Sequence, residues 1–223
     1  EWYAQRAPGL PVEFVGHPLC DRYPDLEFRE PDELHDPPRL LLLPGSRAKE
    51  ISRHLPVMAA AARKLNAEPM IVFPNESLAA QARLLTSAVA DWDLRIGGLH
   101  EALAEADVAI ASSGTVTLEC AWFRVPTVVL YKTSWITYLL GRLFVKVKHI
   151  AMPNVLAERE VFPEFIQRAA TAKNLAREAS RFLDDPDRRK TLRADLNQIA
   201  QTLGQKGAPL RAAKAIVRLL ETR

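Results

Sequence analysis

The chain has 223 residues, of which 48% are hydrophobic and 26% are charged, and its formal net charge is +3. These apolar residues are enough to bury a sizeable core, so the composition excludes wholesale disorder. The small positive charge does not identify a nucleic-acid-binding protein, and we expect no nucleic-acid partner. The two cysteines, Cys20 and Cys120, lie far apart, which excludes a disulfide framework and favours a reducing compartment.

The chain begins Glu1-Trp2-Tyr3, without an initiator Met, so we expect it to be a piece of a longer protein. Its histidines never fall at i, i+4 spacing, and we predict neither a metal site nor a cofactor. Residues 135–147 form the longest strongly apolar stretch, but Arg142 and Lys146 interrupt it and it is too short to span a bilayer.

Hydrophobic patterning predicts strands that alternate with helices along most of the chain. The expected strands cover residues 12–15, 39–43, 69–73, 94–96, 108–111 and 126–131. The expected helices cover residues 46–66, 77–90, 99–104, 112–123, 135–144, 172–183, 187–203 and 208–220, and residues 21–38 form a connecting loop. This order predicts an α/β fold with a doubly wound parallel sheet and extra C-terminal helices.

Residues 44–47, Pro-Gly-Ser-Arg, join the 39–43 strand to the next helix. Gly45 permits a close backbone approach, and Ser46 and the amides that follow offer hydrogen-bond donors at a helix start, where anions are stabilised. Arg47 adds a planar cation that suits phosphate. The turn therefore fits a phosphate site, and it also fits a tight turn with Ser46 as the helix cap.

Residues 112–115, Ser-Ser-Gly-Thr, follow the 108–111 strand in the same way. Ser113, Gly114 and Thr115 suit a diphosphate at a helix start, and Glu119, one turn further on, could accept hydrogen bonds from a ribose diol. The alternative is an ordinary helix cap with a solvated glutamate. The chain contains neither a Walker lysine motif nor G-x-G-x-x-G, which disfavours P-loop hydrolysis and dinucleotide redox chemistry.

A third group of polar residues lies nearer the C-terminus. Asn154 and Gln167 carry amides that could bind a base or a sugar. Glu164 could join them, or it could complement the dipole at a helix start. His17 follows Gly16 and could bond a ligand, although the loop backbone is the better expectation for a lone histidine.

Six short strings make the chain resemble the C-terminal half of the lipid-A-disaccharide synthase family, which are glycosyltransferases of the GT-B type. They occur in the family's order: residues 14–19 with Asp21, 43–47 with Glu50, 111–115 with Leu118 and Glu119, 126–131, 152–156 and 163–167. Each string is weak alone, but six in order over one chain form a specific pattern.

The resemblance implies a Rossmann-like domain that binds a UDP-sugar. The family transfers 2,3-diacylglucosamine from its UDP-activated form to 2,3-diacylglucosamine 1-phosphate, which gives lipid A disaccharide 1-phosphate and UDP. The resemblance assigns donor binding to Ser46, Arg47, Ser113, Gly114, Thr115, Glu119, Asn154, Glu164 and Gln167. It also implies that the general base, the catalytic residue and the acceptor site belong to an N-terminal half that this chain lacks.

The same resemblance sets the expected domains and location. Residues 1–203 would form the donor-binding domain, and residues 204–223 a helix that packs on the missing half. We expect a cytoplasmic protein, with residues 135–147 either resting on the inner membrane surface or packing as a core helix. The alternatives are a UDP-N-acetylglucosamine epimerase, a peptidoglycan glycosyltransferase, or a nucleotide-sugar-binding module without catalysis.

Overall fold

The computed structural model describes residues 3, 6–23, 33–135 and 148–221. The chain divides into two compact units, one of residues 1–26 with residues 200–223 and the other of residues 27–199. The sheet described below belongs to the larger unit. The expected division into residues 1–203 and 204–223 stays a prediction.

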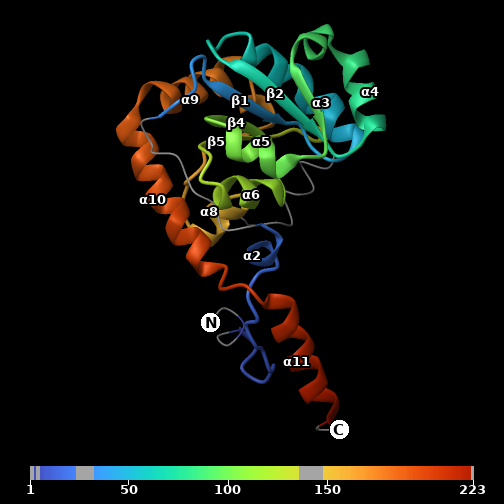
Figure 1. The fold of residues 1–223 in the computed structure, drawn as a ribbon, viewed down its shortest axis with the longest axis vertical. Helices are drawn as coiled ribbons and strands as arrows, with labels where there is room; N and C mark the ends of the chain where they lie inside the picture. Colours follow the sequence, from blue (N-terminus) through green and yellow to red (C-terminus); the bar gives the residue numbers. More distant parts are fainter. Residues whose placement is uncertain (1–2, 4–5, 24–32, 136–147, 222–223) are drawn as a thin grey trace. The chain divides into compact units, whose positions relative to one another are not determined.

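The larger unit is built on a six-stranded sheet in which every pair of neighbours is parallel (Figure 1). The strand order is β3-β2-β1-β4-β5-β6, which is the order of a Rossmann-like doubly wound sheet and confirms the predicted fold class. The strands are β1 (Arg39–Leu43), β2 (Glu68–Phe73), β3 (Asp93–Ile96), β4 (Val108–Ser112), β5 (Thr127–Tyr131) and β6 (Glu164–Ile166).

The central strands are apolar along nearly their whole length because helices cover both faces of the sheet. In β1 the four leucines at 40–43 are buried, and every residue of β4 is buried. The edge strand β3 is more exposed and carries Asp93 and Arg95, which form an ion pair of 2.7 Å. Charged side chains at a sheet edge discourage pairing with other chains.

The helices form two layers because the direction of winding reverses after β3, and right-handed crossovers then place the helices after β3 and β4 on the opposite face (Figure 1). In one layer α3 packs against α4 and α9, and in the other α5 contacts β1 and β2 while α6 contacts α8 and β4. The helices are α3 (Ala48–Ala62), α4 (Glu76–Leu85), α9 (Ala172–Asp184), α5 (Leu99–Glu105), α6 (Val116–Trp122) and α8 (Met152–Ala157). The chain continues into α10 (Pro186–Thr202).

Helix boundaries differ from the sequence predictions where a local hydrogen bond decides them. Asn75 accepts from the amide of Leu78, so α4 starts at Glu76, and the predicted stretch 77–90 breaks at Thr86 into α4 and the 3₁₀ helix η1 (Ser87–Asp91). Ser46 is not the cap of α3, because Arg47 occupies the cap position and makes no side-chain cap bond.

The smaller unit contains α2 (Leu19–Arg22) and α11 (Ala208–Glu221). The predicted strand 12–15 is wrong: within the described residues no neighbouring strand pairs with it, and the carbonyl of Val15 instead accepts from the Arg211 guanidinium at 2.9 Å. The predicted loop 21–38 is wrong at its start, where Asp21 belongs to α2 and accepts from the amides of Gly207 and Ala208.

The apolar stretch at 135–147 lies outside the described residues, apart from Trp135. The guanidinium of Arg168 lies 5.0 Å from the centre of the Trp135 ring. Among the residues that the structure does describe, no helix has the length and apolar character needed to cross a bilayer.

Replacing Leu42 by alanine should test the two-sided burial of β1. Leu42 is fully buried, so Leu42→Ala should lower the free energy of unfolding by about 2–5 kcal/mol through lost burial and the cavity left behind. Leu84→Ala is the matched control, because Leu84 is 89% exposed and its loss should change stability by less than about 0.5 kcal/mol. Urea denaturation of the full chain measures the free energy of unfolding of both variants, and equal losses of stability would contradict the burial of Leu42.

Candidate functional site

The two turns expected to bind anions lie at the carboxyl ends of neighbouring strands. β1 pairs with β4, with Leu43 opposite Ala111, so residues 44–47 and 113–115 leave the same edge of the sheet side by side. α3 follows the first turn on one face, and α6 follows the second on the other. The turns therefore border the topological switch point of the sheet, which is where doubly wound folds bind ligands.

The first turn is held by the carboxylate of Glu50. One carboxylate oxygen accepts from the amide of Ser46 at 3.2 Å, and the other accepts from the Arg47 guanidinium at 2.8 Å. Gly45 has φ +124°, and a Cβ there would lie 2.6 Å from a Glu50 carboxylate oxygen, so only glycine fits. Arg47 is 79% exposed in its side chain, which leaves the guanidinium within reach of an anion from solvent.

The second turn is fastened to residues 150–152. The hydroxyl of Ser113 donates to the carbonyl of Ile150 at 2.8 Å. The hydroxyl of Thr117 donates to the carbonyl of Gly114 at 2.7 Å and accepts from the amide of Met152 at 3.2 Å. A Cβ added at Gly114 would meet nothing within 4 Å, so the backbone of the turn faces open space there.

Asn154 and Glu164 are committed to the protein backbone that supports this segment. Glu164 accepts from the amides of Ile150 and Ala151, at 3.1 and 2.8 Å, and from the Asn154 side chain at 2.7 Å. Asn154 is fully buried; its oxygen accepts from the amides of residues 161 and 162, and its nitrogen donates to the carbonyl of residue 162. Glu164 lies on β6 and not at a helix start, so the alternative interpretation is wrong about its position; its carboxylate instead accepts from the amides just before α8.

Gln167 is used in a similar way next to β6. Its amide oxygen accepts from the backbone amide of Thr133, and its amide nitrogen donates to the Thr133 carbonyl, both at 3.2 Å. The side chain therefore continues the pairing of β5 with β6 beyond the end of the strands.

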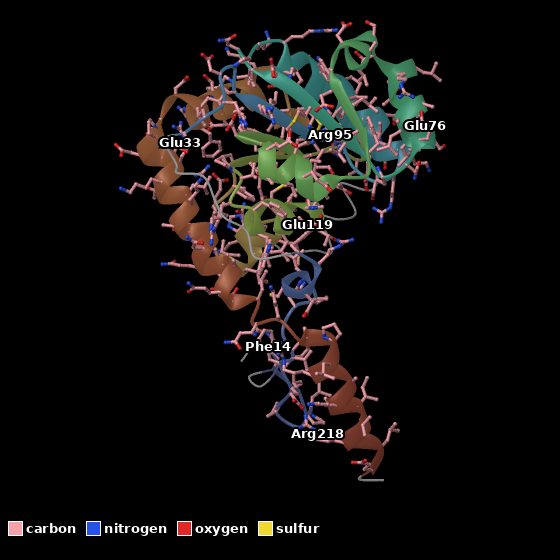
Figure 2. All side chains as sticks on the ribbon, viewed as in Figure 1. Phe14, Glu33, Glu76, Arg95, Glu119 and Arg218 are labelled. Atoms are coloured by element: carbon pink, nitrogen blue, oxygen red, sulfur yellow. The ribbon has the colours of Figure 1, made fainter. Side chains whose placement is uncertain are left out.

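Glu119 lies on α6, one helical turn after the loop of residues 113–115 (Figure 2). Only 5% of its surface is exposed, so a ribose could reach it only by packing closely against α6. All nine predicted site residues lie in the larger unit. Those of the two turns follow the carboxyl ends of β1 and β4, Glu119 and Asn154 lie on α6 and α8, Glu164 begins β6, and Gln167 follows β6. Only the two turns leave exposed groups for direct contact with an anion.

Sequence reasoning missed His54. This histidine on α3 is fully buried and lies 2.9 Å from the Pro44 carbonyl through Nδ1, and its Nε2 accepts from the amide of Lys132 at 3.0 Å. A signal was present: His54 shares the apolar stripe of α3 with Ile51, Leu55 and Met58, and a polar residue on such a stripe needs internal partners.

The chain is similar to known proteins over most of its length. The model of the lipid-A-disaccharide synthetase family matches residues 1–217. Lipid-A-disaccharide synthases of Syntrophus aciditrophicus and Thiobacillus denitrificans are 38% and 39% identical to the chain over 97% of its length. The chain spans 60% of each of these relatives.

A solved structure, MurG of Acinetobacter baumannii, resembles the chain with a TM-score of 0.51 at 17% identity. The match covers 89% of this chain and 54% of MurG. At this level of identity the likeness supports the fold alone.

Asn154→Ala should be strongly destabilising. The substitution leaves two buried amides and one buried carbonyl without partners, so we expect the free energy of unfolding to fall by about 2–5 kcal/mol. Asn174→Ala provides the control, because Asn174 bonds at the surface and its loss should cost less than about 1 kcal/mol. Chemical denaturation compares the two, and a small loss for Asn154→Ala would refute its structural role.

His54 should make stability depend on pH below neutrality. Burial lowers the pKa of His54 from its ordinary value of 6.5, and this outweighs the opposite effects of the Pro44 and Lys132 backbone and of Glu50, while Arg53 lowers the pKa further. In the unfolded chain His54 is therefore protonated near pH 6.5, whereas in the folded chain it is protonated only at a lower pH. The stability that neutral His54 contributes to the folded chain is fully present above pH 6.5 and is lost as the pH falls toward the lowered pKa.

Denaturation of the wild type and of His54→Gln between about pH 7.5 and 5 measures this effect. The wild type should lose up to about 1.4 kcal/mol per pH unit more than the variant. Parallel stability curves for the two proteins would show that His54 does not titrate in this way.

Proposed function

Because the chain belongs to the lipid-A-disaccharide synthetase family, we propose that it forms the donor-binding part of a glycosyltransferase of lipid A biosynthesis. The reaction transfers 2,3-diacylglucosamine from its UDP-activated form to 2,3-diacylglucosamine 1-phosphate. The products are lipid A disaccharide 1-phosphate and UDP. Since the chain spans 60% of its curated relatives, the remaining length of the protein completes the acceptor site and supplies the general base.

The observation that carries this proposal is the adjacency of the two turns at the switch point. A diphosphate that leaves a sugar develops negative charge, which amides at helix starts and a nearby cation stabilise. The turn after β1 offers Ser46 and Arg47, and the turn after β4 offers the backbone around Gly114. A diphosphate placed at this edge of the sheet would meet both turns at once.

The geometry supports a division of labour among the nine predicted residues. Direct contact with the diphosphate falls to Ser46, Arg47, Gly114 and Thr115, while Ser113 holds its turn, because its hydroxyl donates to the Ile150 carbonyl and its amide to the Leu130 carbonyl. Glu119 is the candidate for the ribose. We assign Asn154, Glu164 and Gln167 to holding the backbone segments beside the donor, because their polar atoms already bond protein atoms.

The lipid substrates place the reaction at a membrane surface. Both the donor and the acceptor carry acyl chains, so the enzyme must meet them at the lipid–water boundary. We propose a peripheral enzyme on the cytoplasmic side of the inner membrane. The family match supports the lipid A reaction over that of an epimerase or a peptidoglycan glycosyltransferase. The likeness to MurG supports only the fold.

Calorimetry with nucleotides tests the donor site in the chain itself. UDP should bind at least about tenfold more tightly than UMP or ADP, because the second phosphate and the uracil each add contacts. Equal affinities for the three nucleotides would reject the proposed donor.

Arg47→Ala separates the phosphate contact from the nucleoside contact. Loss of the guanidinium should weaken UDP by about tenfold or more and leave uridine unchanged, because a charge-assisted bond to phosphate is worth about 1.5–3 kcal/mol. Arg63→Ala is the matched control, since Arg63 lies at the other end of α3 and should leave both affinities unchanged. An equal loss of UDP and uridine would mean that Arg47 does not touch phosphate.

A further inference from the structure

We propose that His54 is a positioning residue that ties the first turn of the donor site to the loop after β5, across the end of β4. The inference rests on the proposed function for its ligand, because the turn it positions is the one assigned to phosphate. It concerns a fully buried residue whose hydrogen bonds go to the backbone of Pro44 and Lys132.

The hydrogen bonds of His54 define its tautomer. The Pro44 carbonyl can only accept, so the hydrogen of the neutral ring lies on Nδ1; Nε2, which is 3.0 Å from the Lys132 amide and 3.2 Å from the Lys132 carbonyl, is then the acceptor for the amide. Nδ1 then carries the hydrogen and donates to the Pro44 carbonyl at 2.9 Å. A neutral imidazole bonds the Pro44 carbonyl and the Lys132 amide, whereas an imidazolium would lose the bond from the Lys132 amide and donate instead to the Lys132 carbonyl, 3.2 Å from Nε2.

The two backbone groups belong to segments that no sheet pairing joins. Pro44 follows β1 and Lys132 follows β5, and these strands lie on opposite sides of β4 in the sheet. His54 therefore bridges over the strand that ends in the second turn of the site. The ring of Tyr131 lies tilted beside the imidazole, with centroids 6.0 Å apart, and fills the space next to this bridge.

The bridge holds the part of the first turn that other bonds leave alone. Glu50 binds the amide of Ser46 and the side chain of Arg47, but His54 binds the carbonyl of Pro44, which comes just before the glycine of the turn. On the other side the loop after β5 is already held by Gln167 through Thr133. His54 thus ties the turn at Gly45, where the backbone has φ +124°, to a segment that Gln167 holds next to β6.

Three variants distinguish positioning from plain stability. His54→Leu removes both hydrogen bonds and keeps apolar bulk. His54→Gln can donate to Pro44 and accept from Lys132 through one amide, so it should rescue. His35→Leu is the control, because His35 bonds the buried carboxylate of Asp107 beside the start of β1, at the opposite edge of the sheet.

Calorimetry gives the first readout. His54→Leu should weaken UDP by about tenfold and change uridine by less than about twofold, and His54→Gln should recover most of the UDP affinity. His35→Leu should lower stability without changing the ratio of UDP to uridine affinity. If His54→Leu changes both ligands equally, or if His35→Leu shifts the ratio as much, the positioning role is overturned.

Hydrogen exchange gives a second readout that needs no ligand. In His54→Leu the amides of Lys132 and of residues 46–51 should exchange faster together, while His35→Leu should leave them protected. Unchanged exchange at both segments overturns the inference. Failure of the wild type to bind UDP would instead refute the proposed function, and the exchange result would still decide the role of His54.

His54→Asn keeps the test decisive if the leucine variant does not fold. Its amide nitrogen can replace Nδ1 toward Pro44, but it is too short to accept from Lys132. We expect UDP affinity to fall by about threefold or more with faster exchange at Lys132. Wild-type UDP affinity together with wild-type protection of Lys132 would overturn the proposal.

Discussion

β1 and β4 run side by side at the centre of the sheet, with residues 40–43 paired in parallel to residues 108–111, and the helices that follow them leave toward opposite faces. Parallel strands share a direction, so their carboxyl ends meet at one edge. Opposite helix directions leave the space above that edge uncovered by either helix. The position of both turns follows from this pairing, and the residues that support them depend also on the pairing of β4 with β5 and of β5 with β6.

The polar side chains below and beside the turns are mostly satisfied within the protein. Asn154 and His54 are fully buried, and Gln167 is nearly so, and each bonds backbone groups of segments that lack regular pairing. A buried amide or carbonyl without a partner is costly, so these side chains fix the course of the loops. The groups left to meet a ligand are few, and among them the Arg47 side chain is 79% exposed. A rigid frame that presents a small number of charged contacts suits a ligand whose charge changes during reaction.

The family match and the fold serve different parts of the functional argument. Identity of 38–39% over 97% of the chain identifies the family, whereas the likeness to MurG, at 17% identity, extends only to the arrangement of strands and helices. The chain spans 60% of those relatives. The donor-binding role that we propose for it fits the place of the two turns at the switch point of the sheet.

The sequence by itself determined the fold class, the central strands and the place of the two turns after β1 and β4, whose binding of an anion is our proposal. The continuous apolar run at residues 39–43 is typical of a buried strand, and a glycine with hydroxyl residues at a helix start suits an anion. It failed at residues 12–15, because β-type residues form a strand only where a neighbour supplies the ladder. Only the tertiary structure decided that the two turns are neighbours. The tertiary structure also decided that the side chains of Asn154, Glu164 and Gln167 bond the protein backbone and do not face a ligand site. It also decided that His54 bridges the segments on either side of β4, because strand order and hydrogen-bond partners depend on residues far apart in the chain.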